Sequence, residues 1–236
     1  MSPTAIPGNL ILKNEMVEAD PFFNNVSLLL HGDGANGSTT IVDSSPSPKT
    51  VTAFGDAQIS TAQSKFGGAS LAFTVSAGDR LTATPIAGFA LGAADFTLES
   101  WLYPTAFTTL YAAWIDFRSG AGFQPARPLI WLGTDGKINF NNTLVTVNAL
   151  SLNAWTHVAL VRSSGIITFY LNGIANGSST NATSFLCDAL NIGATNDFPS
   201  TYYYRGYIDD LRITKGIARY TSNFTPPTAP FPEVLG

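Results

Sequence analysis

The chain has 236 residues, a formal net charge of −4 and a sequence pI near 5.0. Only 12% of the residues are charged, and Lys and Arg form no cluster, so a nucleic-acid partner is excluded. No apolar run approaches the roughly 18 residues of a membrane span, and the N-terminus lacks the pattern of a signal peptide. We therefore expect neither membrane insertion nor a secretory signal. A single cysteine, Cys187, excludes an internal disulfide framework.

Three prolines and one short apolar patch characterise residues 1–24. The patch consists of Leu10, Ile11 and Leu12. Because proline favours an extended chain, this segment predicts an N-terminal arm with no core of its own, attached to a partner through the patch. We expect that deleting residues 1–20 leaves the melting temperature of the domain nearly unchanged.

Short apolar runs between turn-forming residues follow the arm and predict strands. These runs lie at residues 26–30, 51–53, near 59, and at 70–74, 80–84, 96–103, 110–117, 128–132, 137–140 and 143–147. The runs 70–74 and 80–84 are expected to pair as a hairpin. Pro104 is expected to end its strand, and Asn141-Asn142 to form the turn between the last two.

The clearest strand signal is the stretch 153–173, in which two strands flank a Ser-Ser-Gly turn. Both faces of the first strand are largely apolar, so it should lie in the middle of a sheet that another layer covers. Trp155 at its start is expected to be a buried core anchor. Its replacement by alanine should then cost about 3–5 kcal/mol.

Two further strands are expected at 190–192 and 206–213, before a proline-rich, irregular tail at 221–236. No apolar pattern of helical period persists for ten residues. The sequence therefore predicts an all-β protein of about a dozen strands in a two-sheet sandwich. Its expected organisation is an arm (1–24), one domain (25–220) and the tail.

Catalytic groups are sparse. Glycoside hydrolysis needs two carboxylates across a cleft, but Glu99 stands alone on its strand and is expected to pair with Arg212 on a neighbouring strand. Asp209 and Asp210 are adjacent, so their side chains should point to opposite faces. No GxSxG motif is present. We therefore expect no enzymatic activity and no required cofactor.

Calcium is the cation that the sequence leaves open, because it binds carboxylates that converge from loops. Asp33, Asp79 and Asp209 lie at strand ends or in loops and are the candidate ligands. The alternative is that each caps its own turn.

Exposed aromatic residues beside polar ones are typical of glycan sites, and two stretches have this composition. The first, DFPSTYYYR, contains Tyr202, Tyr203, Tyr204 and Arg205. The second, RSGAGFQPAR, contains Arg118, Phe123, Gln124 and Arg127. The alternative is that both stretches cover the core or pack on a neighbouring subunit.

A series of motifs extends this prediction from residue 24 to about residue 230. In order they are SLLLHGDG, SKFGGASLAF, DFTLESWLYP, WTHVALVR, TFYLNG, NIGA and GYIDDLRITKGIARYTSNFTPP. The series resembles the laminin-G-like, or concanavalin-A-like, jelly-roll domains, in the version found in bacteriophage tail and virion proteins. The resemblance implies a two-sheet antiparallel jelly-roll sandwich.

The same resemblance implies a non-enzymatic structural protein of a phage virion, either decorating the head or associated with the tail. Other virion proteins and further copies of the chain would then be its partners. The alternative is a carbohydrate-binding adhesion module that recognises glycans of the host surface.

Overall fold

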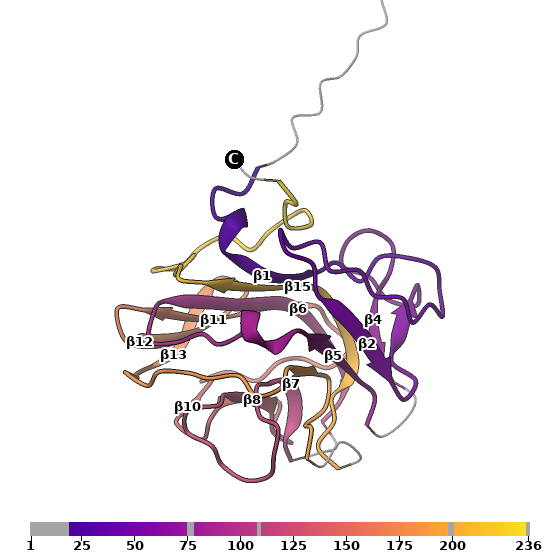
Figure 1. The fold of residues 1–236 in the computed structure, drawn as a ribbon. Helices are drawn as coiled ribbons and strands as arrows, with labels where there is room; N and C mark the ends of the chain where they lie inside the picture. Colours follow the sequence, from indigo (N-terminus) through magenta and orange to yellow (C-terminus); the bar gives the residue numbers. More distant parts are fainter. Residues whose placement is uncertain (1–18, 75–77, 108–109, 198–200, 235–236) are drawn as a thin grey trace, which may run out of the picture.

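The computed structural model describes residues 19–74, 78–107, 110–197 and 201–234. They form two antiparallel sheets packed face to face, which confirms the predicted all-β sandwich (Figure 1). The first sheet contains, in spatial order, β13 (Ile174–Thr180), β12 (Ile166–Leu171), β11 (Thr156–Ser163), β6 (Phe96–Ala106), β15 (Arg205–Lys215), β4 (Ser70–Phe73) and β3 (Gln58–Ser60), with β1 (Val26–Leu30) also paired to β15. The second contains β10 (Leu144–Val145), β9 (Ile138–Phe140), β8 (Leu129–Leu132), β7 (Ala112–Asp116), β14 (Asn191–Ile192), β5 (Arg80–Thr84) and β2 (Thr50–Phe54). Two short 3-10 helices, η1 (Phe23–Asn25) and η2 (Ile86–Gly88), complete the elements of the described ranges.

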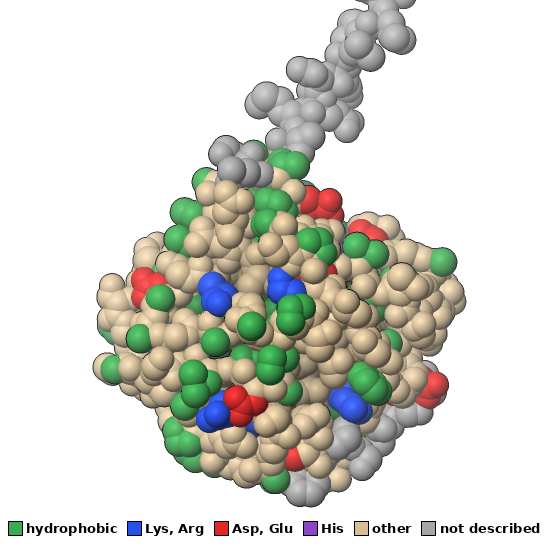
Figure 2. Space-filling view, in the orientation of Figure 1, with side chains coloured by type: hydrophobic (Ala, Val, Ile, Leu, Met, Phe, Trp, Pro, Cys, Tyr) green, Lys and Arg blue, Asp and Glu red, His purple; other side chains and the backbone are tan. Residues whose placement is uncertain are grey.

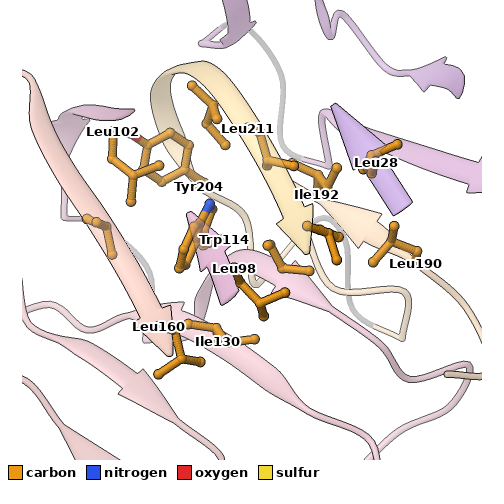
Figure 3. Close-up of a cluster of buried hydrophobic side chains, with 14 of the residues drawn as sticks. Leu28, Leu98, Leu102, Trp114, Ile130, Leu160, Leu190, Ile192, Tyr204 and Leu211 are labelled. Atoms are coloured by element: carbon orange, nitrogen blue, oxygen red, sulfur yellow. The ribbon is translucent and has the colours of Figure 1, made fainter. Parts of the chain in front are cut away.

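The main core fills the space between the two sheets. Leu98 and Leu160 of the first sheet meet Trp114 and Ile130 of the second, and all four side chains are fully buried (Figure 3). Alternation along each strand places such residues on the inner face, as a sandwich requires. Burial of each large apolar side chain contributes about 1.5–3 kcal/mol to folding.

The predicted central hairpin is confirmed as β11 and β12, with β11 lying between β12 and β6. Its turn uses Ser164 and Gly165, whose φ angles are 50° and 78°. The prediction for Trp155 is wrong. Trp155 precedes β11 in the chain. Its side chain is half-buried and lies outside the main core, with its ring 5.3 Å from that of Tyr103. The inner face of β11 belongs to Val158 and Leu160 instead.

Two local expectations fail because the chain changes sheets or bends. Strands β4 and β5 do not pair with each other; β4 belongs to the first sheet and β5 to the second, so the segment between them crosses the sandwich. Pro104 does not end its strand, because β6 continues to Ala106. The proline is tolerated since the opposite strand is irregular there, with a register shift between Arg205 and Gly206.

The C-terminal segment, residues 216–234, lies across the outer face of the first sheet. Tyr220 and Phe224 pack on Ala159, Val161 and Tyr170, which explains why both faces of β11 are apolar. The segment is irregular, as predicted, but it is a structural layer and not a free tail.

The start of the described chain joins the same layer. The backbone N–H of Asp20 donates to the carbonyl of Val234 at 2.9 Å. Phe23 of η1 packs with Val26, Leu29 and Phe231. Residues 20–24, expected in the arm, therefore contact the sandwich. Figure 1 shows these ends beyond β1 and β15, on the opposite side of the molecule from β8 and β10.

The surface reflects the low charge of the sequence. On the face that Figure 2 shows, charged side chains are scattered singly or in opposite pairs among polar and apolar ones. Within the described ranges, no helix has the length and hydropathy needed to span a membrane.

Candidate functional site

A cavity of about 240 Å³ lies on the outer face of the second sheet. Its floor is a small apolar cluster, separate from the main core, that Leu129 and Trp131 form with Ala113 and Tyr111. These side chains alternate with inward-pointing core residues along β7 and β8, so the strands themselves position the floor. The lining residues are Tyr111, Arg118, Gly122, Phe123, Gln124, Leu129, Trp131, Asn141, Asn142, Asp197 and Tyr202.

Four aromatic residues contribute to the lining. The ring of Tyr111 lies 5.2 Å from that of Trp131 and 5.0 Å from that of Tyr202. Phe123 is 57% exposed. Aromatic residues of this kind present large, rigid apolar surfaces to a ligand.

Arg118 is the central polar group of the cavity and is 5% exposed. Its Nε and Nη2 donate to the two carboxylate oxygens of Asp116 at 2.8 and 3.0 Å. Its Nη1 donates to the Gly122 carbonyl at 2.6 Å, and Nη2 also reaches Asp197 at 3.4 Å. Although burial lowers it, the Asp116 carboxylate raises the pKa of Arg118 above its ordinary value, so the guanidinium stays charged.

The loop between β7 and β8 is fixed at both ends by ion pairs. Arg118 fixes the first end, and Arg127 pairs with Asp188 at the second. Phe123 lies between these two anchors. The loop can therefore present an exposed aromatic ring at the mouth of the cavity from a defined position.

The turn between β9 and β10 forms a further part of the rim, and its pairing confirms the prediction for this hairpin. Asn141 and Asn142 have φ angles of 48° and 55°, which asparagine adopts more readily than most residues. The Asn141 amide accepts from the N–H of Leu129 at 2.7 Å and donates to the Pro125 carbonyl at 3.2 Å. One buried side chain thus connects the turn, the floor strand and the loop.

The structure brings together four of the residues singled out from sequence as glycan-binding candidates. Arg118, Phe123, Gln124 and Tyr202 all line the cavity, although two stretches about 80 residues apart supply them. Tyr203 and Arg205 lie elsewhere; Arg205 stacks on Tyr203 at 5.3 Å and donates to the Thr74 carbonyl. Arg127 does not line the cavity either, but anchors the loop.

Tyr204 is a correction to the sequence-based candidates. It is 1% exposed and belongs to the main core, where its ring lies 6.4 Å from that of Phe73 (Figure 3). Its hydroxyl donates to the Tyr207 carbonyl at 3.2 Å. Alternation along the chain turns this ring inward, so it cannot contact a glycan.

Sequence reasoning missed the floor of the cavity. Trp131 occurs in the run Leu-Ile-Trp-Leu, which reads as a strand buried on both faces, and Tyr111 precedes a similar run. Nothing in such a run distinguishes a tryptophan in the core from one on the outer face. The available signal is alternation, which groups Trp131 with Leu129 on one face and Ile130 with Leu132 on the other, without showing which face is outward.

The pairing expected for Glu99 is confirmed. Arg212 donates to it through Nε and Nη2 at 3.0 and 2.8 Å, and the Tyr220 hydroxyl donates at 2.8 Å. Burial raises the pKa of Glu99, but Arg212 and the hydrogen bond from His157 outweigh it and lower the pKa to about 2. This carboxylate is ionised and fully buried on the first sheet, away from the cavity.

The three candidate calcium ligands do not form one group; among the described residues, no cluster of three acidic, His or Cys side chains could bind a metal ion. Asp79 accepts from the backbone N–H of Asp56 at 2.7 Å. Asp209 accepts from the N–H groups of Lys65 and Phe66, and burial raises its pKa to about 7. Asp33 contributes to that raised pKa by its charge. The candidate attachment residues Leu10, Ile11 and Leu12 lie outside the described residues.

Residues 75–218 match the Concanavalin A-like lectin/glucanases superfamily, to which the chain therefore belongs. Among solved structures, it is similar to domain 4 of AbnA, an extracellular GH43 arabinanase of Geobacillus stearothermophilus in complex with arabinotriose. The identity is 19%, the TM-score 0.58, and 82% of this chain and 94% of that one are covered.

The chain is also similar to two toxin domains. The binding domain of Paraclostridial Mosquitocidal Protein 1 has 13% identity and a TM-score of 0.59, with 82% of this chain and 49% of that one covered. The botulinum neurotoxin serotype D binding domain has 16% identity and a TM-score of 0.58, with 84% and 49% covered. The chain thus spans about half of each toxin domain, and these likenesses show the fold. No curated protein matches the sequence.

Proposed function

We propose that the chain is a non-enzymatic carbohydrate-binding module whose ligand occupies the cavity on the second sheet. The observation that carries this proposal is the combination of aromatic rings and polar groups in one cavity. Tyr111, Trp131 and Tyr202 offer apolar surface to the C–H faces of a sugar, while Asn142 and the Arg118–Asp197 pair offer hydrogen-bonding groups to its hydroxyls. Small-molecule sites in proteins commonly combine apolar walls with a few placed polar groups in this way.

The structural relatives support binding over catalysis. The arabinanase domain is described in complex with arabinotriose, and the two toxin domains are named binding domains. Because their sequences are distant, this support extends to the type of module and not to the ligand.

The carboxylates nearest the cavity also favour binding. Hydrolysis of a glycoside needs one carboxyl that stays protonated as an acid and a second that acts as base or nucleophile. Burial raises the pKa of Asp116 and Arg118 lowers it only in part, but this carboxyl is 0% exposed and both of its oxygens accept from Arg118, so it is not placed to reach a glycosidic bond. Asp197 also contacts Arg118, which leaves no second free carboxylate opposite it in the lining. We expect no release of reducing sugar from any polysaccharide by the purified chain.

The test is a glycan array probed with the wild type and with Phe123→Ala. Phe123 is exposed, so its truncation should leave folding intact while it weakens binding of any hit about tenfold or more. The matched control is Phe54→Ala, an exposed phenylalanine on the same sheet but outside the cavity. A blank array, or hits unaffected by Phe123→Ala, Tyr202→Ala and Trp131→Phe, would remove the cavity from consideration.

We propose further that the module is displayed on a phage particle, as the motif series in the sequence implies. The observation that favours display is the position of the chain ends. Asp20 and Val234 are hydrogen-bonded to each other beyond the first sheet, whereas the cavity is on the second. Attachment through residues 1–18 would leave the cavity facing away from the particle. Locating the chain in images of intact particles tests this directly.

A further inference from the structure

We infer that the cavity accepts an uncharged, terminal sugar residue, in preference to an acidic sugar or an internal stretch of a polysaccharide. This inference rests on the proposed carbohydrate-binding function and names the class of glycan. Three features of the site carry it: the charge balance around Arg118, the hydrogen-bonding groups that remain unused, and the contacts that close the rim.

The charge balance disfavours an anionic ligand. The two charged side chains of the lining are Arg118 and Asp197, whose Nη2 and Oδ1 atoms are 3.4 Å apart. Asp116, which is 0% exposed, also pairs with Arg118, so one positive charge faces two negative ones. A ligand carboxylate that displaced Asp116 would leave it buried without its partner, which is strongly unfavourable, and one that approached without displacing it would meet two negative charges around a single positive one.

The unused groups suit a hydroxyl pair. A guanidinium has five N–H groups, and the contacts to Asp116, Gly122 and Asp197 employ one on Nε, one on Nη1 and two on Nη2. Among the described residues, these contacts leave one Nη1–H as a donor, and the Asp197 carboxylate of the same lining is an acceptor. Neighbouring hydroxyls of a neutral sugar can accept from the first group and donate to the second.

Cross-contacts close the rim along one side and one end. Along the side next to β14, the rings of Tyr111 and Tyr202 meet at 5.0 Å. At the end where β7 finishes, Arg118 bridges to Asp197, and the Asn141 amide binds the Pro125 carbonyl at 3.2 Å. A polymer could not pass over this end without breaking those contacts. A chain terminus can instead stop against the Arg118–Asp197 bridge.

The first arm of the test is calorimetric titration of the full chain with a neutral oligosaccharide taken from the array hits and with its analogue ending in a uronic acid. We expect the acidic analogue to bind at least tenfold more weakly at low ionic strength. Asp197→Asn removes one negative charge and should reduce the difference in affinity between the neutral and acidic compounds several-fold. Asp135→Asn, in the exposed β8–β9 turn outside the cavity, is the matched control and should leave that difference in affinity unchanged.

The second arm compares a linear oligosaccharide with a cyclic one built from the same neutral sugar. The cyclic compound has no terminus, so we expect no measurable binding to a cavity closed at one end. Equal affinity for the two compounds, or equal or tighter binding of the acidic analogue, would overturn the inference while leaving carbohydrate binding intact. A blank panel in which no neutral or acidic sugar binds would overturn the proposed function itself.

Discussion

The outer faces of the two sheets contain similar residues, but these residues serve different purposes. On the first sheet, Glu99, Arg212 and Arg219 form a buried network with Asp20, and residues 216–234 cover it. On the second sheet, the Arg118–Asp116 pair lies beside an aromatic cavity that two loops surround without filling. The first face is completed by the chain's own ends, whereas the second is left for a ligand.

The difference shows that a charged or aromatic residue indicates a site only when the chain itself does not satisfy it. Arg212 donates to two carboxylates and stacks on the ring of Phe231 at 3.6 Å, so its binding capacity is used within the fold. Arg118 is also paired, yet it borders open space. The covered face should therefore respond to mutation through stability, and the open face through binding.

The largest expected effect is on the covered face. Arg212→Ala leaves Glu99 buried without its main partner and removes one of the two arginines that bind Asp20, and breaking such a buried pair typically costs about 3–5 kcal/mol. Chemical denaturation measures the loss of stability, with Asp135→Asn in the exposed β8–β9 turn as a control expected to stay within about 0.5 kcal/mol. A loss below about 1 kcal/mol would mean that the pairs of Arg212 with Glu99 and Asp20 do not stabilise the covered face.

How far the sequence leads can be judged from the same residues. It predicted the sandwich and the hairpin of β11 and β12, because alternation and turn residues are local signals. It also predicted the pairing of Glu99 with Arg212, because a lone carboxylate on a buried strand needs a cation. It did not predict that Tyr220 and Phe224 cover β11, since a proline-rich tail carries no strand pattern that would place it on a sheet.

The site shows the same limit. Arg118, Phe123 and Tyr202 were recognisable as loop residues of the right composition, but their meeting depends on long-range topology. Composition suggests the wrong face for both Trp131 and Tyr204. The tryptophan of the apolar run lies on the outer face of its sheet, and the tyrosine of the polar loop lies in the main core. Which face a side chain takes is decided by sheet register, which a single sequence does not specify.

A smaller effect is expected at the uncovered part of the first sheet. Trp155 is half-buried against Tyr103, so Trp155→Ala should cost about 1–2 kcal/mol, the range of a partly exposed aromatic contact and below that of a core deletion. Denaturation midpoints of Trp155→Ala and of the core variant Trp114→Ala provide the comparison. A loss for Trp155→Ala as large as that for Trp114→Ala would restore the role of core anchor.

The covered face should also carry a pH dependence through His31. Its Nδ1 lies 2.6 Å from Asp210 and its Nε2 lies 3.0 Å from Glu233 of the C-terminal segment. Burial lowers the pKa of His31, but Asp210 and Glu233, with a smaller contribution from Asp33, raise it above the ordinary 6.5. Because the folded state binds the His31 proton more tightly than the unfolded state does, the contribution of His31 to stability is fully present at pH values below its pKa in the unfolded state.

This stabilisation is lost as the pH rises through the folded pKa of His31. The stability difference between wild type and His31→Gln should therefore be larger near about pH 6 than near about pH 9. Urea denaturation at the two pH values measures it. A stability difference that is the same at both pH values, or larger at the alkaline one, contradicts the ion pairs of His31 with Asp210 and Glu233.

The smallest effect is expected where the chain enters the covered face. The Asp20 carboxylate accepts from Arg219 through Nη1 and Nη2, at 3.0 and 2.7 Å, and from Arg212 at 3.2 Å. We therefore propose that the domain includes Asp20 and does not begin only after residue 24. Deleting residues 1–18 retains every one of these contacts and should leave the melting temperature within about 2 °C. Extending the deletion to residue 20 removes the carboxylate from two buried guanidinium groups and should lower the melting temperature clearly.

Thermal unfolding of both truncations, with Asp20→Asn in the full chain as the matched point variant, separates the loss of the Asp20 charge from the loss of the chain segment. If both truncations unfold at the same temperature as the full chain, Asp20 is not a structural part of the covered face, and the boundary belongs after residue 24 as the sequence alone suggested.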